Sequence, residues 1–537
     1  MRHIIDSLIL LDGRARLAVA VVAGAVSALA LAPFNAFPVL WVTLPVAVWL
    51  IDGSVPGRDA GVIGRLLPAA VTGWGFGFGY FLAGFWWVGN AFLVVGGPMV
   101  AAMPFAIAAF AALLALYWGL AAAVARLLWS DGPARVCVFA VAFALAEWLR
   151  GHLFGGLPWN ALGVVLTPNV VMMQSASLVG LWGLTLAAFL VFAAPAALHP
   201  ASGRSGMMRG ATVVAAAAVL MLAHVGFGVA RLALAGAIPD PGMAGPDAVL
   251  VRIVHPGIAQ KIDWSAGEMA DASARLIAFT GAGGAYADHP GAKVVVWPEA
   301  AFPFVLGSNA GTLAAIARLQ PEGAMLVAGA VRSGAADDDN QRWFNSVLVV
   351  DDRGEVVARH DKVRLIPFGE YLPAQDLLAR LGLRPFVALP GGFAAGERVR
   401  TIDLKGLPPF AASVCYEATF PDAVLPADSR PAWLVNVTND GWFAGTPGVW
   451  QHYQQVRLRA VEQGLPLLRA ANRGVSAILG PYGRVWADLP PDEIGFVDGV
   501  LPQGLSKTWY AHARGAVFWL LCAFALGCGL RVGGRTT

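Results

Sequence analysis

Long uncharged stretches dominate the first part of this 537-residue chain. The run from Leu17 to Ile51 carries no charge and is broken by the turn PFNAFP at Pro33–Pro38, and residues 66–125 contain no Asp, Glu, Lys or Arg. Because a helix needs about 20 apolar residues to cross a bilayer, each run predicts two spans. Further runs predict spans at about 135–152, 170–198, 211–236 and 514–531. The pattern therefore predicts eight spans, seven of them before residue 240.

Between residues 248 and 500 the apolar runs become short and rich in β-branched residues, with helical patterns between them. Helices are expected near 266–280, 309–319 and 449–464, and two strand–turn–strand patterns, VLVVDDRGEVVAR and SAILGPYGRVWADL, predict hairpins. The expected buried strands are AVLVRIV, KVVVW, MLVAGAV, SVLVV, FAASVCY, AWLVNVT and LLRAAN. Strands that alternate with helices indicate an α/β domain of layered sheets.

These patterns divide the chain into three regions: a transmembrane domain with seven spans at 1–236, the α/β domain at 237–510, and a last span with its tail at 511–537. Short cytoplasmic loops are enriched in Lys and Arg. The following arginines near the spans fall on one side, and the opposite loops carry almost none until Arg150: Arg2, Arg14, Arg16, Arg58, Arg65, Arg126, Arg135, Arg204, Arg209, Arg531 and Arg535. Both termini are therefore expected in the cytoplasm, and seven spans then place the α/β domain outside it.

Composition agrees with a membrane protein, because 57% of the residues are apolar and 13% are charged, against about 25% charged in soluble domains. A net charge of +3 without a long basic run argues against nucleic acid. No HExxH or CxxC pattern is present, so no metal or other cofactor is expected. We interpret the first span as retained and not as a signal peptide, since no clear small-residue cleavage site follows it.

Two features within the spans allow a structural or a functional interpretation. The stripe GWGFGFGYFLAGFWW at Gly73–Trp87 favours close helix packing through small residues over a cofactor site. Glu147 and Arg150 in EWLRG lie three residues apart near a membrane face, where ionisable residues are costly and often functional. A paired, snorkelling structural role is the alternative for these two residues.

Polar side chains follow several of the expected strands, where α/β domains commonly build active sites on loops. Glu299 follows VVVWP, Lys362 lies in RHDKVRLIPFGEYLP, and Cys415 ends FAASV. A free cysteine is usually a buried, inert hydrophobe. Cys415, however, is the only one of four cysteines outside the predicted spans, so it has no disulfide partner in its domain. With a carboxylate base to take its proton and a cation to favour the thiolate, it has what a nucleophile needs.

The ordered motifs VVWPEAAFP, RHDKVRLIPFGEYLP and SVCYEATFP resemble the Glu-Lys-Cys triad of the nitrilase, or carbon-nitrogen hydrolase, superfamily. Lys362 follows Glu299 by 63 residues, and Cys415 follows Lys362 by 53. With eight spans around such a domain, the chain resembles the apolipoprotein N-acyltransferase family, and EWLRG…LPWN at Glu147–Asn160 is similar to a loop pattern of that family. The resemblance implies an αββα sandwich for the α/β domain and a bacterial inner-membrane location with a periplasmic catalytic domain.

The resemblance also implies a reaction. Cys415 would attack the ester carbonyl of a phospholipid acyl donor to give a thioester, and Glu299 would act as general base. Lys362 would stabilise the oxyanion, a role in which a preorganised charge can contribute about 3 kcal/mol. The acceptor would be the α-amino group of the diacylglyceryl-cysteine of an apolipoprotein. No nucleic-acid partner is implied.

Further positions match residues that the family needs near its triad. Glu370, Tyr416 and Glu417 match supporting residues, with an ion pair or strand-end hydrogen bond as the structural alternative. Trp264 in KIDW matches a substrate-binding position, but an aromatic there could instead fill the core. Asn439 and Asp440 in NVTNDGWF are expected to shape a turn at the site and are left out of the catalytic set.

The sequence departs from the family pattern in two places. The first strand leads into IVHPGIAQ, with His255 and Pro256 where the family has a QGN type of stretch, and the loop after LPW lacks a glutamine. Both changes bear on substrate fit, because neither touches the triad.

The apolar loop Leu377–Phe393 is expected to act as a mobile lid at the membrane interface, with Phe386 and Leu389 binding substrate. A loop packed on the domain surface is the alternative. Two rival functions stay open: a membrane-tethered amidase that uses water as acceptor, and a non-catalytic membrane scaffold.

Overall fold

The computed structural model divides the chain into two compact units. One, the helical unit, comprises Met1–Gly89, Ala101–Leu234 and Trp509–Thr537, and the other, the sheet unit, comprises Asn90–Val100 and Ala235–Thr508. The short segment Asn90–Val100, between two expected spans, thus belongs with the sheet unit. The structure describes residues 2–55, 61–130, 132–198, 203–238, 245–261, 263–300, 310–320, 322–334, 342–375, 380, 385–386, 392–421, 424–426 and 429–533.

The helical unit contains a helix for each expected span. Six segments of the described residues are long and apolar enough to cross a membrane, and two shorter apolar helices lie at Phe37–Asp52 and Ala516–Gly529. This set agrees with the predicted eight spans. The helices are α1 (Arg2–Ile9), α2 (Gly13–Ser27), α3 (Leu40–Asp52), α4 (Val62–Phe85), α6 (Met99–Leu127), α7 (Arg135–His152), α8 (Val170–Met173), α9 (Ala176–Ala193), α10 (Gly203–Ala233), α16 (Trp509–Ala513) and α17 (Ala516–Gly533), with α5 (Asn90–Val95) in the sheet unit.

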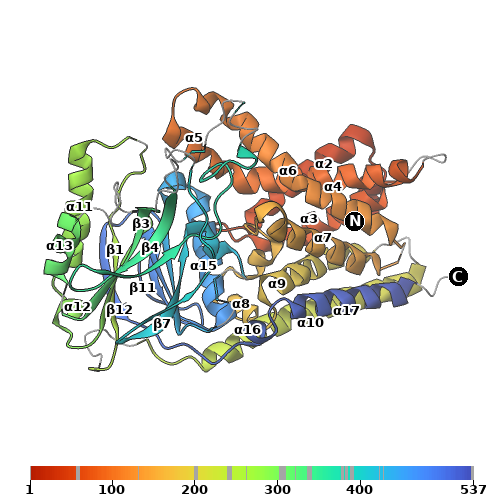
Figure 1. The fold of residues 1–537 in the computed structure, drawn as a ribbon. Helices are drawn as coiled ribbons and strands as arrows, with labels where there is room; N and C mark the ends of the chain where they lie inside the picture. Colours follow the sequence, from red (N-terminus) through yellow and green to blue (C-terminus); the bar gives the residue numbers. More distant parts are fainter. Residues whose placement is uncertain are drawn as a thin grey trace. The chain divides into compact units, whose positions relative to one another are not determined.

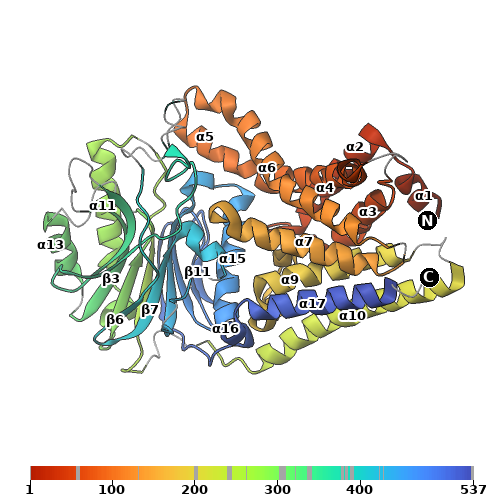
Figure 2. The same ribbon diagram turned by 45° about the vertical axis from the view of Figure 1, so that its right-hand side comes forward.

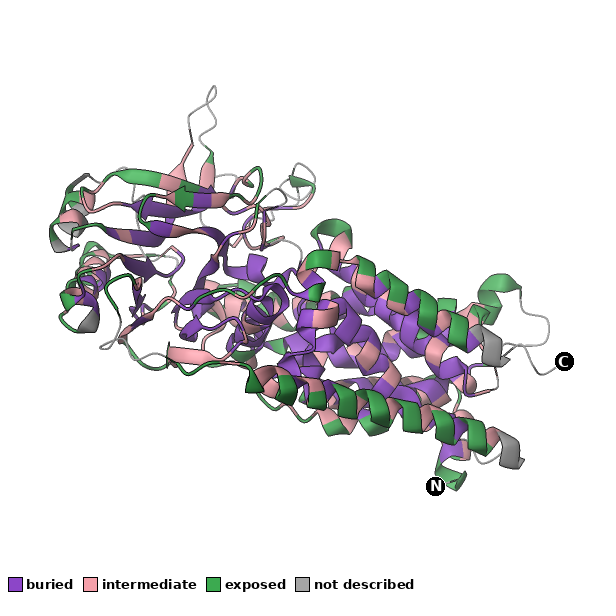
Figure 3. Ribbon diagram, turned by 90° about the horizontal axis from the view of Figure 1, so that it is seen from below, coloured by how far each residue is buried: buried purple, intermediate pink, exposed green. Residues whose placement is uncertain are grey.

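The outer surface of the helical unit is apolar. Along α6, five large apolar side chains at helical spacing are exposed: Leu113, Leu116, Leu120, Val124 and Leu127. Figure 3 shows the general pattern, in which helices carry exposed residues along one side and buried residues along the other. A soluble surface rarely exposes so continuous an apolar stripe, so these side chains are suited to contact with lipid.

The glycines of the stripe Gly73–Trp87 allow helices α2 and α4 to pack with their backbones in contact. A Cβ atom at Gly79 would lie 1.9 Å from the carbonyl oxygen of Val21, and one at Gly24 would lie 1.9 Å from that of Phe76. No larger residue fits at such a distance. The expectation of close packing through small residues is confirmed.

Glu147 and Arg150 form a buried ion pair in α7. Arg150 Nη2 lies 2.7 Å from Glu147 Oε2, both side chains are fully buried, and Trp118 Nε1 donates to Glu147 Oε1 at 2.8 Å. Arg150 also donates to the carbonyl oxygen of Trp159 at 3.0 Å. The pair is therefore structural within this unit and does not snorkel, because a snorkelling side chain would reach the surface.

The sheet unit is built on two six-stranded sheets. The first has the order β12-β1-β2-β3-β4-β5 and the second β11-β10-β9-β8-β7-β6, with β1, β2 and β3 parallel to one another and β7, β8 and β9 likewise. The strands are β1 (Leu250–His255), β2 (Lys293–Trp297), β3 (Ala324–Ser333), β4 (Trp343–Val350), β5 (Val356–Asp361), β6 (Thr401–Leu404), β7 (Leu407–Val414), β8 (Trp433–Asn439), β9 (Leu467–Asn472), β10 (Ser476–Leu479), β11 (Val485–Leu489) and β12 (Gly495–Val500). Both predicted hairpins are present, as β4-β5 and β10-β11.

Helices cover the outer face of each sheet. The helices α11 (Ala266–Thr280), α12 (Ala285–Asp288) and α13 (Ala310–Leu319) lie on the first sheet, and α15 (Pro447–Gln463) lies on the second (Figures 1 and 2). One core cluster includes Leu276 of α11 and Trp297 of β2, and another includes Val456 of α15 and Leu434 of β8. Since the sheets also contact each other through β1 and β9 and through β4 and β7, the unit is an αββα sandwich, as predicted.

Candidate active site

Three of the predicted site residues stand directly at strand ends. Glu299 follows β2 by two residues, Lys362 follows β5, and Cys415 follows β7 as the first residue of a short 3-10 helix, η10 (Cys415–Thr419). Each is buried, with 7%, 1% and 7% of its surface exposed, respectively. Charged groups are almost never buried to this extent unless they are paired, so their partners decide what the site can do.

Lys362 and two carboxylates form a compact charged cluster. Lys362 Nζ lies 2.9 Å from Glu370 Oε1 and 3.6 Å from Glu299 Oε1. Asn345 Nδ2 donates to both carboxylates, at 2.7 Å to Glu299 Oε1 and 3.0 Å to Glu370 Oε1. The second oxygen of Glu299 accepts from the backbone N–H of Asn439 at 2.8 Å. Glu370, predicted as a supporting residue, is thus the nearest carboxylate to the lysine.

The cluster holds one ammonium between two carboxylates. Burial alone would lower the pKa of Lys362, but Glu370, Glu299 and Cys415 outweigh burial and raise it, so the lysine stays protonated. The pKa of Glu299 is raised, mainly by burial and also by the charge of Glu370, against the opposing effect of Lys362. A carboxylate whose pKa moves up from its usual value becomes a stronger base, as general-base catalysis requires.

Cys415 sits on a strained backbone. Its φ is +50°, a left-handed conformation that costs an L-residue about 1–2 kcal/mol. Such strain persists where the surrounding structure enforces it, and it is concentrated at active sites. Burial, and then the charge of Glu299, raise the pKa of the thiol, while Lys362 lowers it. The cysteine therefore rests as a thiol and needs a base before it can act as a nucleophile.

Glu417 joins the lysine loop to the cysteine strand. Its Oε1 accepts from the backbone N–H groups of Val363 at 2.7 Å and Arg364 at 3.0 Å, and its Oε2 accepts from the backbone N–H of Val414 at 2.8 Å. Burial would raise the pKa of Glu417, but hydrogen bonding and charge from His360 and these backbone groups lower it. This geometry matches the structural alternative of strand-end hydrogen bonds, and it places Lys362 relative to Cys415.

The structure describes three of the four remaining predicted residues, Tyr416, Phe386 and Trp264. Tyr416 is buried and packs edge-on against Phe420, with ring centroids 4.9 Å apart. Phe386 packs edge-on against Phe92 of α5 at 5.1 Å. Leu389 lies outside the described residues, so its predicted role is a hypothesis from the sequence alone.

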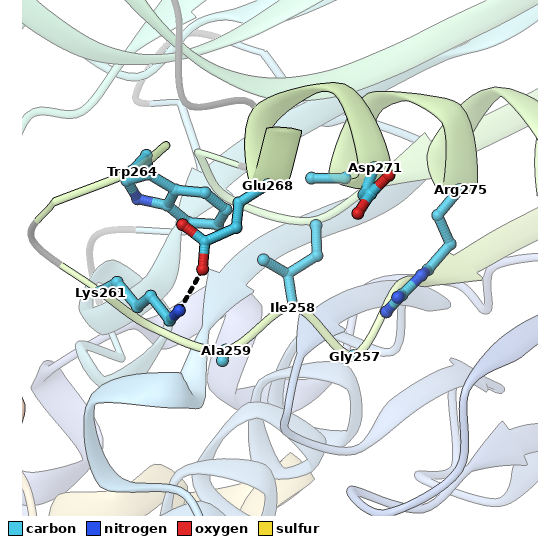
Figure 4. Close-up of a pocket in the computed structure, with 9 residues that line it drawn as sticks. Gly257, Ile258, Ala259, Lys261, Trp264, Glu268, Asp271 and Arg275 are labelled. Atoms are coloured by element: carbon cyan, nitrogen blue, oxygen red, sulfur yellow. Dashed lines mark hydrogen bonds and ion pairs between the residues drawn. The ribbon is translucent and has the colours of Figure 1, made fainter. Parts of the chain in front are cut away.

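Trp264 packs against the core of the first sheet and also lines a pocket with a volume of about 260 Å³ (Figure 4). Lys261 and Glu268, which form an ion pair, line the same pocket. The pocket loop reaches the cluster indirectly, because Gln260 Oε1 accepts from Asn439 Nδ2 at 2.6 Å. Trp264 thus fills part of the core, as the alternative expected, while one side of it faces this pocket.

Sequence reasoning missed Asn345, which bridges the two carboxylates from strand β4. A single amide in the otherwise apolar end of WFNSVLVV was the available signal. Asn439 shapes a turn as expected, since its Oδ1 accepts from the N–H of Gly441 at 3.1 Å. Its backbone N–H, however, also holds Glu299, and no side-chain pattern predicts such a contact.

Known family models match both parts of the chain. The carbon-nitrogen hydrolase family model matches residues 256–510, and the model for the apolipoprotein N-acyltransferase N-terminal domain matches residues 23–194. The fold and site thus define a membrane protein with a nitrilase-like catalytic domain. An amidase of Nesterenkonia sp. of known structure is 20% identical, with a TM-score of 0.36, and covers 52% of this chain and 97% of its own.

Full-length relatives narrow the class further. The apolipoprotein N-acyltransferase of Brucella suis biovar 1 (strain 1330) is 45% identical over 503 residues, which are 94% of this chain and 92% of the relative. That of Sinorhizobium fredii (strain NBRC 101917 / NGR234) is 43% identical over 533 residues, 98% of this chain and 97% of the relative. The chain belongs to the apolipoprotein N-acyltransferase family.

Proposed function

We propose that this protein transfers an acyl chain from a phospholipid to the α-amino group of the diacylglyceryl-cysteine at the start of an apolipoprotein. Cys415 carries the chain between the two substrates as a thioester. The observation that carries this proposal is the buried cluster of Lys362, Glu299 and Glu370, in which Glu299 and Lys362 act electrostatically on the Cys415 thiol. The family relationship over most of the chain supports the choice of substrates.

In the first half-reaction, Glu299 takes the proton from Cys415 Sγ as the sulfur attacks the ester carbonyl carbon. Negative charge develops on the carbonyl oxygen, and the ammonium of Lys362 stabilises it. The ester C–O bond then breaks, and Glu299 returns the proton to the departing lysophospholipid oxygen. Glu370 keeps Lys362 charged and in place, while Tyr416 and Glu417 support the strand end.

In the second half-reaction, the amine of the apolipoprotein attacks the thioester carbonyl and gives a proton to Glu299. The C–S bond breaks as the amide forms, and the proton returns to the sulfur, so that Cys415 is a thiol again. Burial of the nucleophile favours an amine that is delivered by binding over bulk water. The products are an N-acylated lipoprotein and a lysophospholipid.

A transfer assay with the purified protein in detergent tests the acceptor. The assay combines a phospholipid that carries a labelled acyl chain with a diacylglyceryl-cysteine peptide, and it follows label in the peptide and in free fatty acid. Label in the peptide, abolished by Cys415→Ala, supports transfer. Label that appears only in fatty acid would favour the amidase-like use of water, and a Cys415→Ala variant that still supports function in cells would favour the scaffold.

We further propose that the protein lies in a bacterial inner membrane with both termini in the cytoplasm and the sheet unit in the periplasm. The one-sided distribution of flanking arginines supports this orientation. A C-terminal green fluorescent protein fusion should fluoresce, and alkaline phosphatase fused after Pro256 should be active. The reverse pair of results would overturn the orientation.

Residues 377–393 are proposed to admit the acyl chain as a lid at the interface, and the packing of Phe386 on Phe92 supports an apolar path there. Replacement of Phe386 and Leu389 by Ser should slow turnover in lipid while the thermal unfolding midpoint stays close to that of wild type, since Phe386 is only partly buried. Unchanged turnover in phospholipid vesicles would contradict the lid hypothesis.

A further inference from the structure

A buried polar cluster lies beneath the nucleophile and has no part in the chemistry proposed above. It consists of Asp440, His452 and Arg469, whose side chains are fully buried. They come from three different elements: Asp440 begins η11 (Asp440–Phe443), His452 lies in α15, and Arg469 lies in β9. Buried charges are costly unless each is paired and hydrogen-bonded, so the position of this cluster calls for a specific role.

The cluster reaches the backbone of the nucleophile. His452 Nε2 lies 3.2 Å from the carbonyl oxygen of Cys415, and Asn436 Nδ2 donates to the same oxygen at 3.3 Å. Because a carbonyl oxygen can only accept, Nε2 carries the proton in this hydrogen bond. Two side chains from different elements therefore hold one carbonyl group, directly next to the sulfur-bearing Cα.

The orientation of the His452 ring is itself fixed. Its Nδ1 lies 2.9 Å from Asp440 Oδ1, and Arg469 Nη2 donates to the other oxygen of that carboxylate at 2.7 Å. Thr438 Oγ1 donates to Asp440 Oδ1 at 3.1 Å. Arg469 and Thr438 thus hold Asp440. With the ring proton on Nε2, Nδ1 accepts from Arg469 Nη2 at 3.2 Å, which keeps Nε2 directed at Cys415.

The carbonyl group matters because Cys415 has a left-handed backbone, with φ at +50°. A relaxed backbone would return to negative φ, and the Cα–Cβ bond would swing with it. The sulfur would then move relative to Glu299 and Lys362, which are anchored by other strands. The contact of His452 is to the backbone oxygen, so His452 itself bears on the thiol through the peptide unit, whereas the charge of Asp440 raises the pKa of the thiol directly.

We propose that His452 is a positioning residue, which holds the strained Cys415 backbone so that the thiol faces its base and its cation. The proposal rests on the proposed function for its first readout, the acylation of Cys415. Its second readout does not depend on that function. A displacement of about 1 Å in a reacting group can lower a rate on the order of 10²-fold, which sets the size of the expected effect.

Two substitutions separate the contacts of His452. His452→Gln places an amide nitrogen near the position of Nε2 and can still donate to the Cys415 carbonyl. His452→Asn places its amide near Nδ1, so it faces Asp440 and leaves the carbonyl. His289→Asn is the matched control, because His289 Nε2 also bonds a backbone carbonyl, that of Ala248 at 2.9 Å, in the same unit.

The experiment measures three quantities for the full-length protein in detergent: the single-turnover rate of Cys415 acylation by phospholipid, the rate of Cys415 alkylation by iodoacetamide resolved by peptide mass spectrometry, and the thermal unfolding midpoint. We expect His452→Asn to lower the acylation rate about 100-fold at an unchanged KM for phospholipid, and to lower the alkylation rate as well. We expect His452→Gln to recover most of both rates.

Equal rates for the Asn and Gln variants overturn the proposal. If both match wild type, the carbonyl contact has no effect on the thiol. If both are slow and unfold at the same lowered midpoint, His452 only stabilises the fold. Failure of the wild type to acylate would count against the proposed function, whereas the alkylation rates would still decide the role of His452. If His289→Asn lowers the acylation rate as much as His452→Asn does, the effect comes from losing any imidazole-to-carbonyl hydrogen bond in the unit, and the proposal is overturned.

Discussion

Glu299→Gln is the substitution that separates proton transfer from structure most cleanly in this site. Glutamine has nearly the same shape, but it has one acceptor oxygen where glutamate has two. In the structure both oxygens accept, Oε1 from Asn345 at 2.7 Å and Oε2 from the backbone of Asn439 at 2.8 Å. The amide NH₂ must therefore face one of these donors, and one hydrogen bond is lost.

The loss of one hydrogen bond and the loss of the general base differ enough in magnitude to be distinguished. A buried polar group that loses its partner costs about 1–3 kcal/mol. Lys362 keeps Glu370 at 2.9 Å as its counter-charge, so no uncompensated cation is left. Loss of a general base, by contrast, costs 10²- to 10⁴-fold in rate, which is about 3–5 kcal/mol in activation free energy. Because burial raises the pKa of the Cys415 thiol, the sulfur stays protonated and reacts slowly without a base.

The assay is single-turnover acylation of Cys415 by phospholipid, followed by intact-protein mass spectrometry, with the unfolding midpoint measured on the same sample. Glu397→Gln is the matched control, because Glu397 is exposed and forms a surface ion pair with Arg400. We expect acylation to fall at least 100-fold in Glu299→Gln and to be unchanged in the control. A folded Glu299→Gln protein that acylates within about tenfold of wild type would refute the assignment of the base.

Three further predictions follow from the same contacts. Lys362→Met should lower the free energy of unfolding by about 3–5 kcal/mol, because Glu299 and Glu370 then lie buried without a cation, and chemical denaturation that shows no loss would contradict the pairing. Glu417→Gln cannot accept all three backbone N–H groups and should cost about 1–3 kcal/mol, measurable as a lower unfolding midpoint; an unchanged midpoint would argue against its bridging role. Burial lowers the pKa of His255 to about 4, so the neutral form is favoured in the fold, and stability that is complete above pH 6.5 should fall by up to about 3 kcal/mol as the pH falls toward 4. His255→Asn should lack this part of the loss, and parallel acid unfolding curves for the two proteins would contradict it.

The layered architecture was predictable because each buried strand and each helix has its own local pattern. The helix expected at 266–280 is observed as α11 with the same bounds, and the β4-β5 and β10-β11 hairpins follow their turn sequences. Strands β6 and β12 were not predicted. The sequence GFVDGV of β12 contains two glycines and is stabilised by its pairing with β1, about 245 residues earlier in the chain, which no local pattern reveals.

The site was predictable to the level of its strand-end residues and less so in its geometry. FAASVCY predicted a strand through Tyr416, yet the strand ends at Val414 and Cys415 turns into a left-handed conformation. A positive φ at a cysteine is imposed by tertiary contacts and has no sequence signal of the kind that glycine gives. For the same reason His452 was missed: its neighbours Asp440 and Arg469 lie in other elements, and only folding brings them beneath the nucleophile.

The most direct test of the central claim is to follow one acyl group onto Cys415. Purified protein is mixed with a phospholipid that carries a labelled acyl chain, and the labelled peptide is located before and after treatment with hydroxylamine. The account predicts label on the peptide that contains Cys415, released by hydroxylamine and discharged into a diacylglyceryl-cysteine peptide. A folded protein that forms labelled lipopeptide with no label ever passing through Cys415 would contradict it.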